Sequence, residues 1–343
     1  MTTKKKIVFV VNPISGTHGK RAILKWIDER IDRTTYDYTV VKTQHAGHAV
    51  QIAAEAAAQQ TDIVVAIGGD GTINEIGRSL VHTDTALGII PCGSGNGLAR
   101  HLRISLDPQA AIDIINEGKM ACIDYGKINN IPFFCTCGVG FDAFVSLKFA
   151  DSGKRGLLTY LENTLHESLN YKPETYEIEN EEGTVKYKAF LIACANASQY
   201  GNNAYIAPQA SLTDGLMDVT ILEPFTVLDV PSLSFQLFNR TIDQNSRIKT
   251  FRSKKIKIHR SKEGVLHFDG DPLMAGKDIE VELIPKGLNI IIPDKKKESE
   301  PFSLLQQMTE TLSGLRPKGE TFTMRNKRLF ELNKNLLRRL SKK

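Results

Sequence analysis

Three glycine-rich segments of this 343-residue chain have the residue types and spacing to bind phosphate. Each follows a short apolar run rich in β-branched residues and precedes a helical pattern. The segments are NPISGTHGK after residues 7–11, GGDG after 62–67 and CGSGNG after 87–91. The first N–H groups of a helix lack intrahelical partners and attract anions, and glycine lets the backbone approach a ligand closely. Three such loops at successive strand ends therefore predict a phosphate site.

The middle loop, within IGGDGTINEI (67–76), carries a carboxylate. A carboxylate beside phosphate repels it unless a cation lies between them, so we expect Asp70 to act through Mg²⁺, directly or through water. Thr72 fits a helix N-cap, and Glu75 three residues later completes a capping box. The alternative is a hairpin turn built on Asp-Gly, which the following helical pattern disfavours.

Two widespread phosphate motifs do not fit these loops. GTHGKR does not satisfy G-x-x-x-x-G-K-[ST], and GSGNG does not satisfy G-x-G-x-x-G. The segment from Gly138 to Ala143 has the glycine spacing of the second motif, but it lies among β-like runs, so we expect no dinucleotide site there. His101 and His267 each stand alone in a helix-like or strand-like segment, and we interpret both as structural rather than as catalytic bases.

The order of the patterns predicts two domains and a tail. Residues 1–125 alternate buried-strand and helix patterns, which indicates an α/β domain with a parallel sheet. Residues 126–294 are mostly short β-like runs separated by turns, which predicts an antiparallel β-rich domain, a sandwich or a flattened barrel. Helical patterns interrupt it at 155–169 and 227–239. Residues 295–343 read as a basic linker followed by a basic amphipathic helix.

Charge and cysteine content narrow the class of protein. The net charge is +5, but residues 295–343 hold 13 Lys and Arg against 5 Glu, which leaves the rest of the chain near −3. The basic character belongs to the tail, so we expect no nucleic-acid partner. The five cysteines show no paired zinc spacing and predict reduced thiols in a cytoplasmic protein. No apolar run approaches the length of a membrane span.

Five segments, in order, resemble a known family. NPISG, GGDGTINE, PCGSGN, APQASLTDGLMDV and HFDGD are similar to motifs of the diacylglycerol kinase catalytic-domain superfamily, especially the soluble bacterial lipid kinases and the sphingosine kinases, over roughly residues 4–294. The resemblance implies a nucleotide-binding α/β domain facing a β-sandwich, with ATP and lipid meeting between them. It also implies Mg²⁺-dependent transfer of the γ-phosphoryl group to a lipid hydroxyl.

The resemblance assigns roles to individual residues. Those implied to contact the nucleotide are Asn12, Ser15, Gly16 and Thr43; the phosphate cradle comprises Gly68, Gly69, Asp70, Gly71, Thr72 and Glu75; a second wall comprises Gly93, Ser94, Gly95 and Asn96. Asp269 is implied to be the general base, while Asp271 replaces the family's usual Glu and joins Asp70 as a catalytic and metal-binding carboxylate. Asp214 matches a structural metal position of some bacterial members.

One departure from the family bears on the acceptor. Bacterial diacylglycerol kinases commonly have Asn-Asp where this chain has Asn96-Gly97, which leaves the metal network around position 97 open. GSGNGLA is more similar to the sphingosine kinase pattern. Asp142 lies near where those kinases bind the amine of a sphingoid base; the alternative is a polar residue at a sheet edge.

The sequence is compatible with three functions. The first is an ATP-dependent lipid kinase acting on diacylglycerol or a sphingoid base. The second is a kinase of a soluble substrate such as NAD, and the third is a non-catalytic lipid- or nucleotide-binding regulator. We expect a lipid substrate at a membrane surface, with the tail docking on the inner face of the membrane. The alternative for the tail is packing on the body of the protein or on a second subunit of a homodimer.

Overall fold

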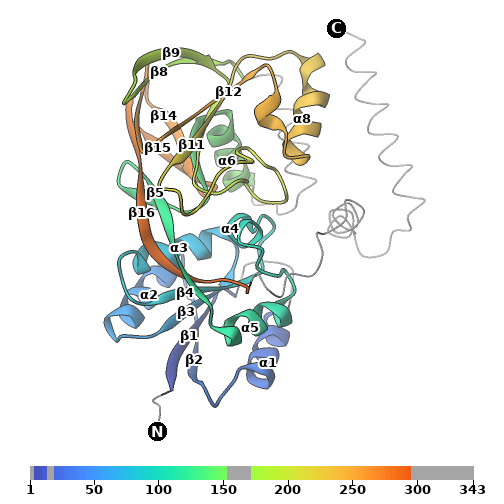
Figure 1. Cartoon of the computed structure of the whole chain (residues 1–343), viewed down its shortest axis with the longest axis vertical. Coiled ribbons are helices and arrows are strands. Elements are labelled where there is room, and N and C mark those ends of the chain that lie inside the picture. Colours follow the sequence, from blue (N-terminus) through green and yellow to red (C-terminus); the bar gives the residue numbers. More distant parts are fainter. Residues whose placement is uncertain (1–3, 14–18, 153–170, 295–343) are drawn as a thin grey trace, which may run out of the picture. The chain divides into compact units, whose positions relative to one another are not determined.

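The computed structural model describes residues 4–13, 19–152 and 171–294 (Figure 1). All of these residues belong to one compact unit, Met1–Lys297. Four features predicted from the sequence lie outside the described residues: Ser15, Gly16, the helix at 155–169 and the tail at 295–343.

The first part of the chain forms a parallel α/β sheet, as its alternating patterns predict. Four strands run parallel in the order β2-β1-β3-β4. Strands β3 and β4 are buried along their whole length, because continuous apolar runs allow both faces of a strand to be covered. The elements are β1 (Lys5–Val11), α1 (Lys20–Arg30), β2 (Tyr36–Lys42), α2 (His48–Ala58), β3 (Ile63–Gly68), α3 (Asp70–Leu80), β4 (Ala86–Pro91), α4 (Gly97–His101) and α5 (Pro108–Glu117).

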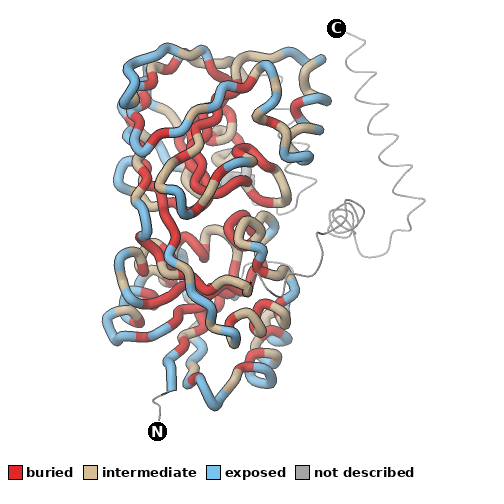
Figure 2. The backbone as a smooth tube through the Cα atoms, viewed as in Figure 1, coloured by how far each residue is buried: buried red, intermediate tan, exposed pale blue. Residues whose placement is uncertain are grey.

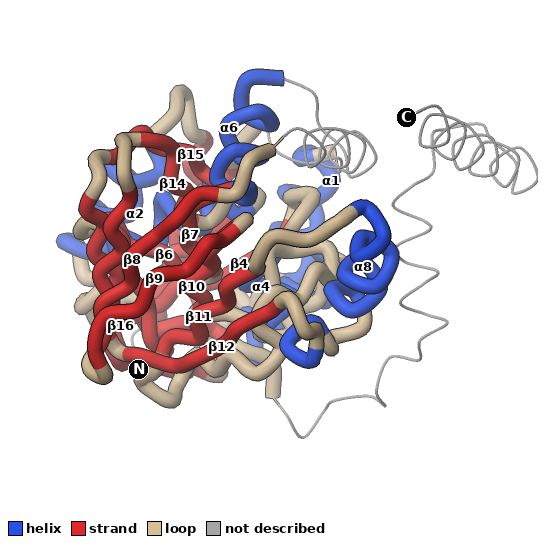
Figure 3. Tube along the Cα trace, turned by 90° about the horizontal axis from the view of Figure 1, so that it is seen from above, coloured by secondary structure: helices blue, strands red, loops and turns tan. Residues whose placement is uncertain are grey.

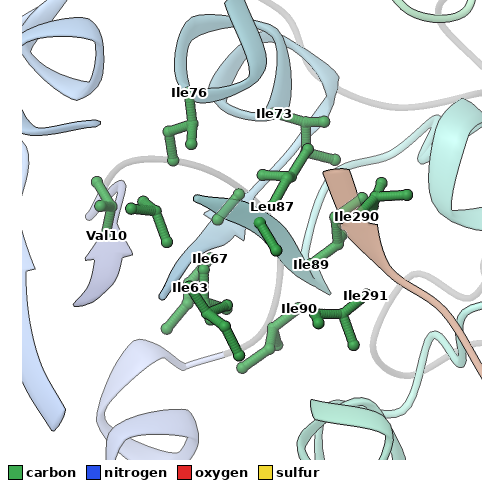
Figure 4. Close-up of a cluster of buried hydrophobic side chains, with 14 of the residues drawn as sticks. Val10, Ile63, Ile67, Ile73, Ile76, Leu87, Ile89, Ile90, Ile290 and Ile291 are labelled. Atoms are coloured by element: carbon green, nitrogen blue, oxygen red, sulfur yellow. The ribbon is translucent and has the colours of Figure 1, made fainter. Parts of the chain in front are cut away.

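The last strand, β16 (Asp278–Ile291), belongs to both parts of the fold. It pairs antiparallel with β5 (Met120–Ile128) and β13 (Lys255–Arg260), and near its end it lies parallel to β4, with Ile290 opposite Leu87. Figure 4 shows Ile290 and Ile291 in the same apolar cluster as Leu87. The sequence pattern assigned this run to the β-rich part, whereas its end completes the core of the parallel sheet.

The second part is a β-sandwich, as predicted. A sheet in the order β12-β11-β10-β7-β14-β15 packs against β5, β8, β13 and β16 of the first sheet, and a buried apolar core fills the space between. Figure 2 shows where the buried residues lie along the backbone. The remaining strands are β6 (Ile131–Phe133), β7 (Thr136–Gly140), β8 (Glu174–Asn180), β9 (Gly183–Ala189), β10 (Leu191–Ala195), β11 (Met217–Leu222), β12 (Ile248–Ser253), β14 (Gly264–Phe268) and β15 (Asp271–Ala275).

Helices cover the outer face of this second sheet. α6 (Phe141–Ser152) contributes Phe141 and Val145 to a third apolar cluster, and α8 (Val230–Phe238) contributes Leu233. The helix predicted at 227–239 is confirmed by α8 and the short η1 (Val227–Asp229) before it, and η2 (Ile242–Gln244) follows. Figure 3 shows α8 outside the strands of this sheet. Among the described helices, none is long and apolar enough to cross a bilayer.

A buried arginine closes the open end of the β14–β15 hairpin. Arg260 is 3% exposed, and its guanidinium donates to the main-chain carbonyls of Gly264, Val265, Ala275 and Gly276 at 2.7–3.0 Å. Burial lowers the pKa of Arg260, and the four carbonyl oxygens compensate for the lost water. Arg260 therefore fixes the base of the hairpin whose turn holds Asp269.

Arg260→Lys is expected to lower the free energy of unfolding by roughly 2–4 kcal/mol, because an ammonium group cannot reach four carbonyls that a planar guanidinium bridges. Urea unfolding measures the loss. Arg252→Lys is the matched control: Arg252 is 42% exposed and paired with Asp218, so its replacement is expected to cost less than about 1 kcal/mol. Equal losses in the two variants would contradict the role given to Arg260.

Candidate active site

The carboxyl edge of the parallel strands brings the predicted nucleotide loops together. Asn12 follows β1 and Thr43 follows β2. The N–H of Asn12 donates to the Ile67 carbonyl at 3.2 Å, and the N–H of Thr43 donates to the Val11 carbonyl at 2.9 Å. The Asn12 side chain also donates to the Thr72 hydroxyl at 3.1 Å. The first and middle loops are therefore joined, at the edge where ligands bind in open α/β sheets.

The helix after the middle loop begins earlier than the sequence predicts. α3 starts at Asp70 with Gly69 as its N-cap, and no side chain caps it. The predicted capping box is wrong, because the glycines before Asp70 let the chain enter the helix before Thr72. Glu75 instead accepts the N–H of Gly47 at 3.1 Å, which holds the loop after β2 against α3.

Asp70 joins the middle loop to the third loop. Its Oδ2 accepts the N–H of Asn96 at 2.8 Å, and its Oδ1 accepts the N–H of Gly97 at 2.7 Å. The backbones of the two loops pack closely at Gly69 and Gly93, since a Cβ on Gly93 would lie 2.6 Å from the Cα of Gly69. Burial raises the pKa of Asp70 to about 6, although the two N–H bonds oppose this shift. Asp70 thus shapes the predicted phosphate cradle, and its action through Mg²⁺ stays a prediction.

The third loop is closed by its own asparagine. Asn96 is buried, and its side chain both accepts the N–H of Gly93 at 2.9 Å and donates to the Gly93 carbonyl at 2.8 Å. Ser94 and Gly95 lie between these anchors, and Ser94 is exposed. At Gly97 a Cβ would lie 3.2 Å from Cys135 Sγ, tighter than ordinary van der Waals contact, so the family's aspartate would be crowded in this loop.

HFDGD is a hairpin turn that also carries an enclosed carboxylate. Asp269 and Gly270 have φ of +48° and +90°, as a two-residue turn between β14 and β15 requires. The Asp269 carboxylate accepts four N–H groups at 2.8–3.2 Å, which fills the roughly four acceptor positions that a carboxylate has. The donors are the side-chain amide of Asn74 and the main chain of Phe134, Cys135 and Thr136.

Sequence reasoning missed Asn74, which belongs to the site, and Asp124, a buried carboxylate that binds the main chain beside Asp214. Asn74, on α3, is 1% exposed and donates to the Pro132 carbonyl as well as to Asp269, so it ties the first part of the fold to the hairpin. Asp124, also buried, accepts the N–H of Gly215 at 2.8 Å and that of Lys286 at 2.7 Å. The available signal was a polar side chain inside an apolar pattern, because buried polar groups require partners.

Asp271, two residues after Asp269, keeps its oxygens open. Among the described residues no hydrogen bond to its carboxylate is present. A Cβ on Gly71 would lie 3.8 and 3.9 Å from its two oxygens, so the carboxylate faces the first turn of α3. Asp271 is exposed, but the protein atoms around its carboxylate displace part of its hydration, which raises its pKa to about 6, and the negative charges of Asp269 and Glu75 add to this shift.

These carboxylates form an acidic cluster at the start of α3. Burial also raises the pKa of Asp269, while its four donors oppose the shift, and its charge raises the pKa of Asp70. No group of three or more Asp, Glu, His or Cys side chains is arranged to hold a metal ion within the described part of the chain. Mg²⁺ characteristically needs only one or two carboxylates, because water and substrate phosphates complete its coordination.

Asp142 lies in an enclosed polar trio rather than at an open edge. Its Oδ2 is 3.1 Å from His267 Nε2 and accepts the Tyr200 hydroxyl at 3.1 Å, and its Oδ1 accepts the N–H of Ala143. The side chains of Asp142 and His267 are 9% and 2% exposed. An amine could reach this carboxylate only by displacing neighbours that already satisfy it.

Two further predicted positions have protein partners. Asp214 accepts the N–H of Leu216 at 3.1 Å and lies 3.6 Å from Arg252, so a cationic side chain is beside the predicted structural metal position. His101 Nδ1 accepts the N–H of Ser198 at 3.0 Å, and burial lowers the pKa of His101 to about 4. A neutral, engaged imidazole agrees with the structural interpretation of His101.

Comparison with known proteins assigns this arrangement to a family. Residues 6–128 match the diacylglycerol kinase catalytic domain, and residues 135–292 match the YegS C-terminal NAD kinase beta sandwich-like domain. A diacylglycerol kinase of Mycobacterium tuberculosis is 30% identical over 308 residues, which cover 84% of this chain and 95% of that protein. The chain belongs to the diacylglycerol kinase family of lipid kinases.

Other relatives agree with this assignment. A diacylglycerol kinase of Bacillus subtilis is 26% identical over 301 residues, covering 86% of this chain and 98% of the relative. The crystal structure of a diacylglycerol kinase from Bacillus anthracis superimposes with a TM-score of 0.65 at 19% identity, covering 85% of this chain and 98% of that one. The superposition shows that this chain and the Bacillus anthracis protein share a fold.

The close packing at Gly97 generates a prediction about the family's aspartate. Gly97→Asp is expected to lower the free energy of unfolding by more than about 2 kcal/mol, because the new side chain meets Cys135 and brings a second carboxylate beside Asp70. Ser94→Asp adds the same charge to an exposed position of the same loop and is expected to change stability by less than about 0.5 kcal/mol. A stable Gly97→Asp variant with increased Mg²⁺ affinity would show that the loop can rebuild the family's metal network.

Proposed function

We propose that this chain transfers the γ-phosphoryl group of ATP, with Mg²⁺, to the hydroxyl of a neutral lipid of the diacylglycerol class. The observation that supports the proposal most directly is the open carboxylate of Asp271 opposite Gly71. The N-terminus of α3 attracts phosphate, and a carboxylate across from it can accept the proton of an attacking hydroxyl. Family membership supports the choice of a lipid acceptor.

The contacts of the two hairpin carboxylates favour Asp271 as the general base over Asp269, the residue named from the sequence. Asp269 would have to give up an N–H donor before it could accept another proton donor. No donor among the described residues occupies the acceptor positions of Asp271, and a pKa of about 6 suits a base that works near neutral pH. Asp269 then acts as a positioning residue that holds the hairpin against α3.

In the proposed reaction the lipid hydroxyl oxygen attacks the γ-phosphorus while its proton passes to Asp271. The bond between the γ-phosphorus and the bridging oxygen breaks, and ADP leaves. Asp70 and Asp271 would be the carboxylates that hold Mg²⁺, and desolvation together with the negative charge of Asp269 raises the pKa of both. The ion, when bound, would neutralise charge on the phosphates. The N–H groups of Gly69 to Thr72 orient the phosphoryl group.

The surroundings of Asp142 support a neutral acceptor over a sphingoid base. A cationic amine needs an accessible anion, whereas the carboxylate of Asp142 is enclosed by Tyr200 and His267. A diacylglycerol has a hydroxyl group and ester oxygens but no charged group, so its binding does not require an accessible anion.

The assignment of the base is tested by two variants. Asp271→Asn is expected to lower kcat with a lipid acceptor by about 10²–10⁴-fold without lowering Tm, because its carboxylate accepts no bond from the described protein and repels Asp269. Asp269→Asn is expected to lower both activity and stability, the latter by about 1–3 kcal/mol, because an amide cannot accept all four N–H groups. Phosphoryl-transfer assays and urea unfolding measure the two effects.

Asp271→Glu is the matched control and is expected to stay within about tenfold of the parent kcat, since it keeps the base. In the parent protein kcat/KM is expected to fall as the pH drops through about 6, because protonated Asp271 cannot take up the hydroxyl proton. An active Asp271→Asn variant beside a folded but inactive Asp269→Asn variant would return the role of base to Asp269.

The acceptor class is tested by measuring ATP consumption with diacylglycerol, sphingosine, ceramide, phosphatidylglycerol and NAD. We expect turnover with diacylglycerol to exceed that with sphingosine by at least about tenfold. A preference for sphingosine that disappears in Asp142→Asn would show that Asp142 is accessible to an amine. Turnover of NAD alone would reject the lipid acceptor altogether.

A further inference from the structure

The segment formed by η1 and α8 exposes apolar side chains to solvent. Leu228 is 90% exposed, Phe235 67%, Val227 44% and Phe238 40%. Monomeric proteins seldom leave contiguous large apolar groups in water without a partner. We call this set the α8 stripe.

The spacing of the stripe is helical. The two pieces form one continuous helical segment, because Asp229 and Val230 at their junction both have right-handed helical backbone. Leu228, Phe235 and Phe238 of the stripe, together with the exposed Pro231, therefore recur at intervals of three and four and lie along one side. Residues 230–238 carry no charged side chain. Inserting this side into an apolar medium would therefore bury no charge.

The stripe is held in place by the opposite side of the same segment. Leu233 is buried in the third apolar cluster, and the Leu237 carbonyl accepts the N–H of Tyr205 at 2.9 Å. A capping box between Thr226 and Asp229 fixes the start. The exposed side chains are thus presented by an anchored helix.

The same anchoring connects the stripe to the proposed phosphate cradle. Arg240 donates to the Tyr205 hydroxyl at 2.6 Å and lies over its ring at 4.2 Å. The loop preceding Tyr205 reaches the third glycine loop, since the N–H of Asn202 donates to the Gly95 carbonyl at 3.0 Å. Arg100 of α4 donates to Asn203 of that loop. A partner that binds the stripe would therefore have a fixed position relative to the proposed site of phosphoryl transfer.

Positive charge accompanies the C-terminal end of α8. Arg240 and Arg103 are exposed, and the charge of each lowers the pKa of His101 on α4. Asp229, the carboxylate within this helical segment, is engaged by Thr226 and by Arg247 at 3.6 Å. An apolar side flanked by cations matches the surface of an anionic bilayer.

We propose that the α8 stripe docks this protein on anionic lipid bilayers, with Leu228, Phe235 and Phe238 inserted at the headgroup–acyl boundary. The inference rests on the proposed function, because a kinase of a bilayer lipid needs a surface that presents its site to the membrane. The occupant is the membrane rather than a second copy of the chain, since the flanking arginines would repel their own copies across a two-fold axis.

Insertion is tested with an environment-sensitive fluorophore on the full chain. Cys122 is exposed and the other four cysteines are buried, so Cys122→Ser provides a background with no exposed thiol. In it, Leu228→Cys carries the label, and Val185→Cys, at an equally apolar and 50% exposed position on β9, is the control. Vesicles of phosphatidylglycerol and phosphatidylcholine are expected to shift the emission of the label at 228 to the blue and to leave that at 185 unchanged.

Affinity is tested with Phe235→Ser/Phe238→Ser against Val185→Ser. The double variant is expected to bind the same vesicles at least about tenfold more weakly, while its kcat with a monomeric short-chain diacylglycerol stays within about twofold of the parent. All variants keep residues 295–343, so any contribution of the tail is common to them.

The outcomes separate this inference from the proposed function. Unshifted emission at 228, or an unchanged vesicle affinity of the double variant, overturns membrane docking even if monomeric diacylglycerol is phosphorylated. Conversion of a dimer to a monomer in the double variant, with vesicle binding intact, also overturns it and makes the stripe an interface between copies. Vesicle binding through the stripe without any lipid phosphorylation leaves docking supported and rejects the proposed function.

Discussion

The carboxylate of Asp269 is the interaction on which the proposed site depends. Its four N–H donors come from α3, through Asn74, and from the connection between β6 and β7 with the first residue of β7, while Asp269 itself lies in the turn of β14 and β15. Three segments far apart in the sequence meet at one anion. Because of this junction, the neighbouring Asp271 is held opposite the first turn of α3, at the end of a hairpin whose base is fixed by Arg260.

The sequence predicted those features that local pattern determines. Continuous apolar runs followed by glycine loops indicated the parallel strands and the edge where the loops meet, and short β-like runs indicated the sandwich. The hydrophobic pattern could not show that residues near Ile290 lie beside β4, because the sequence of an apolar strand does not indicate which strand it pairs with. Asn74 was missed for a related reason: its partner, Asp269, is 195 residues away. The capping box failed because Thr72 is a good N-cap residue, but Gly69 already occupies that position.

The site combines binding and repulsion in one small region. The carboxylate of Asp70 accepts N–H groups of the third loop, and that of Asp269 accepts N–H groups at the junction. The carboxylate of Asp271 accepts neither set, so three similar side chains differ in their hydrogen bonding. Desolvation raises the pKa of all three, so negative charge held at this place lowers the stability of the fold near neutral pH. A cation that binds there together with phosphates would offset this loss of stability. Functional sites commonly lower the stability of a protein in this way.

The path of β16 has a consequence for biosynthesis. The strand that flanks β4 is made from residues close to Ile290, whereas β4 ends at Pro91. During translation the N-terminal sheet emerges from the ribosome with one edge uncovered until about two hundred further residues have been added. Buried Leu87 and Ile89 remain without their final neighbours during that interval. The nascent chain is therefore exposed to chaperones and to mispairing at this edge for most of its synthesis, and its native core closes only as the last strand appears.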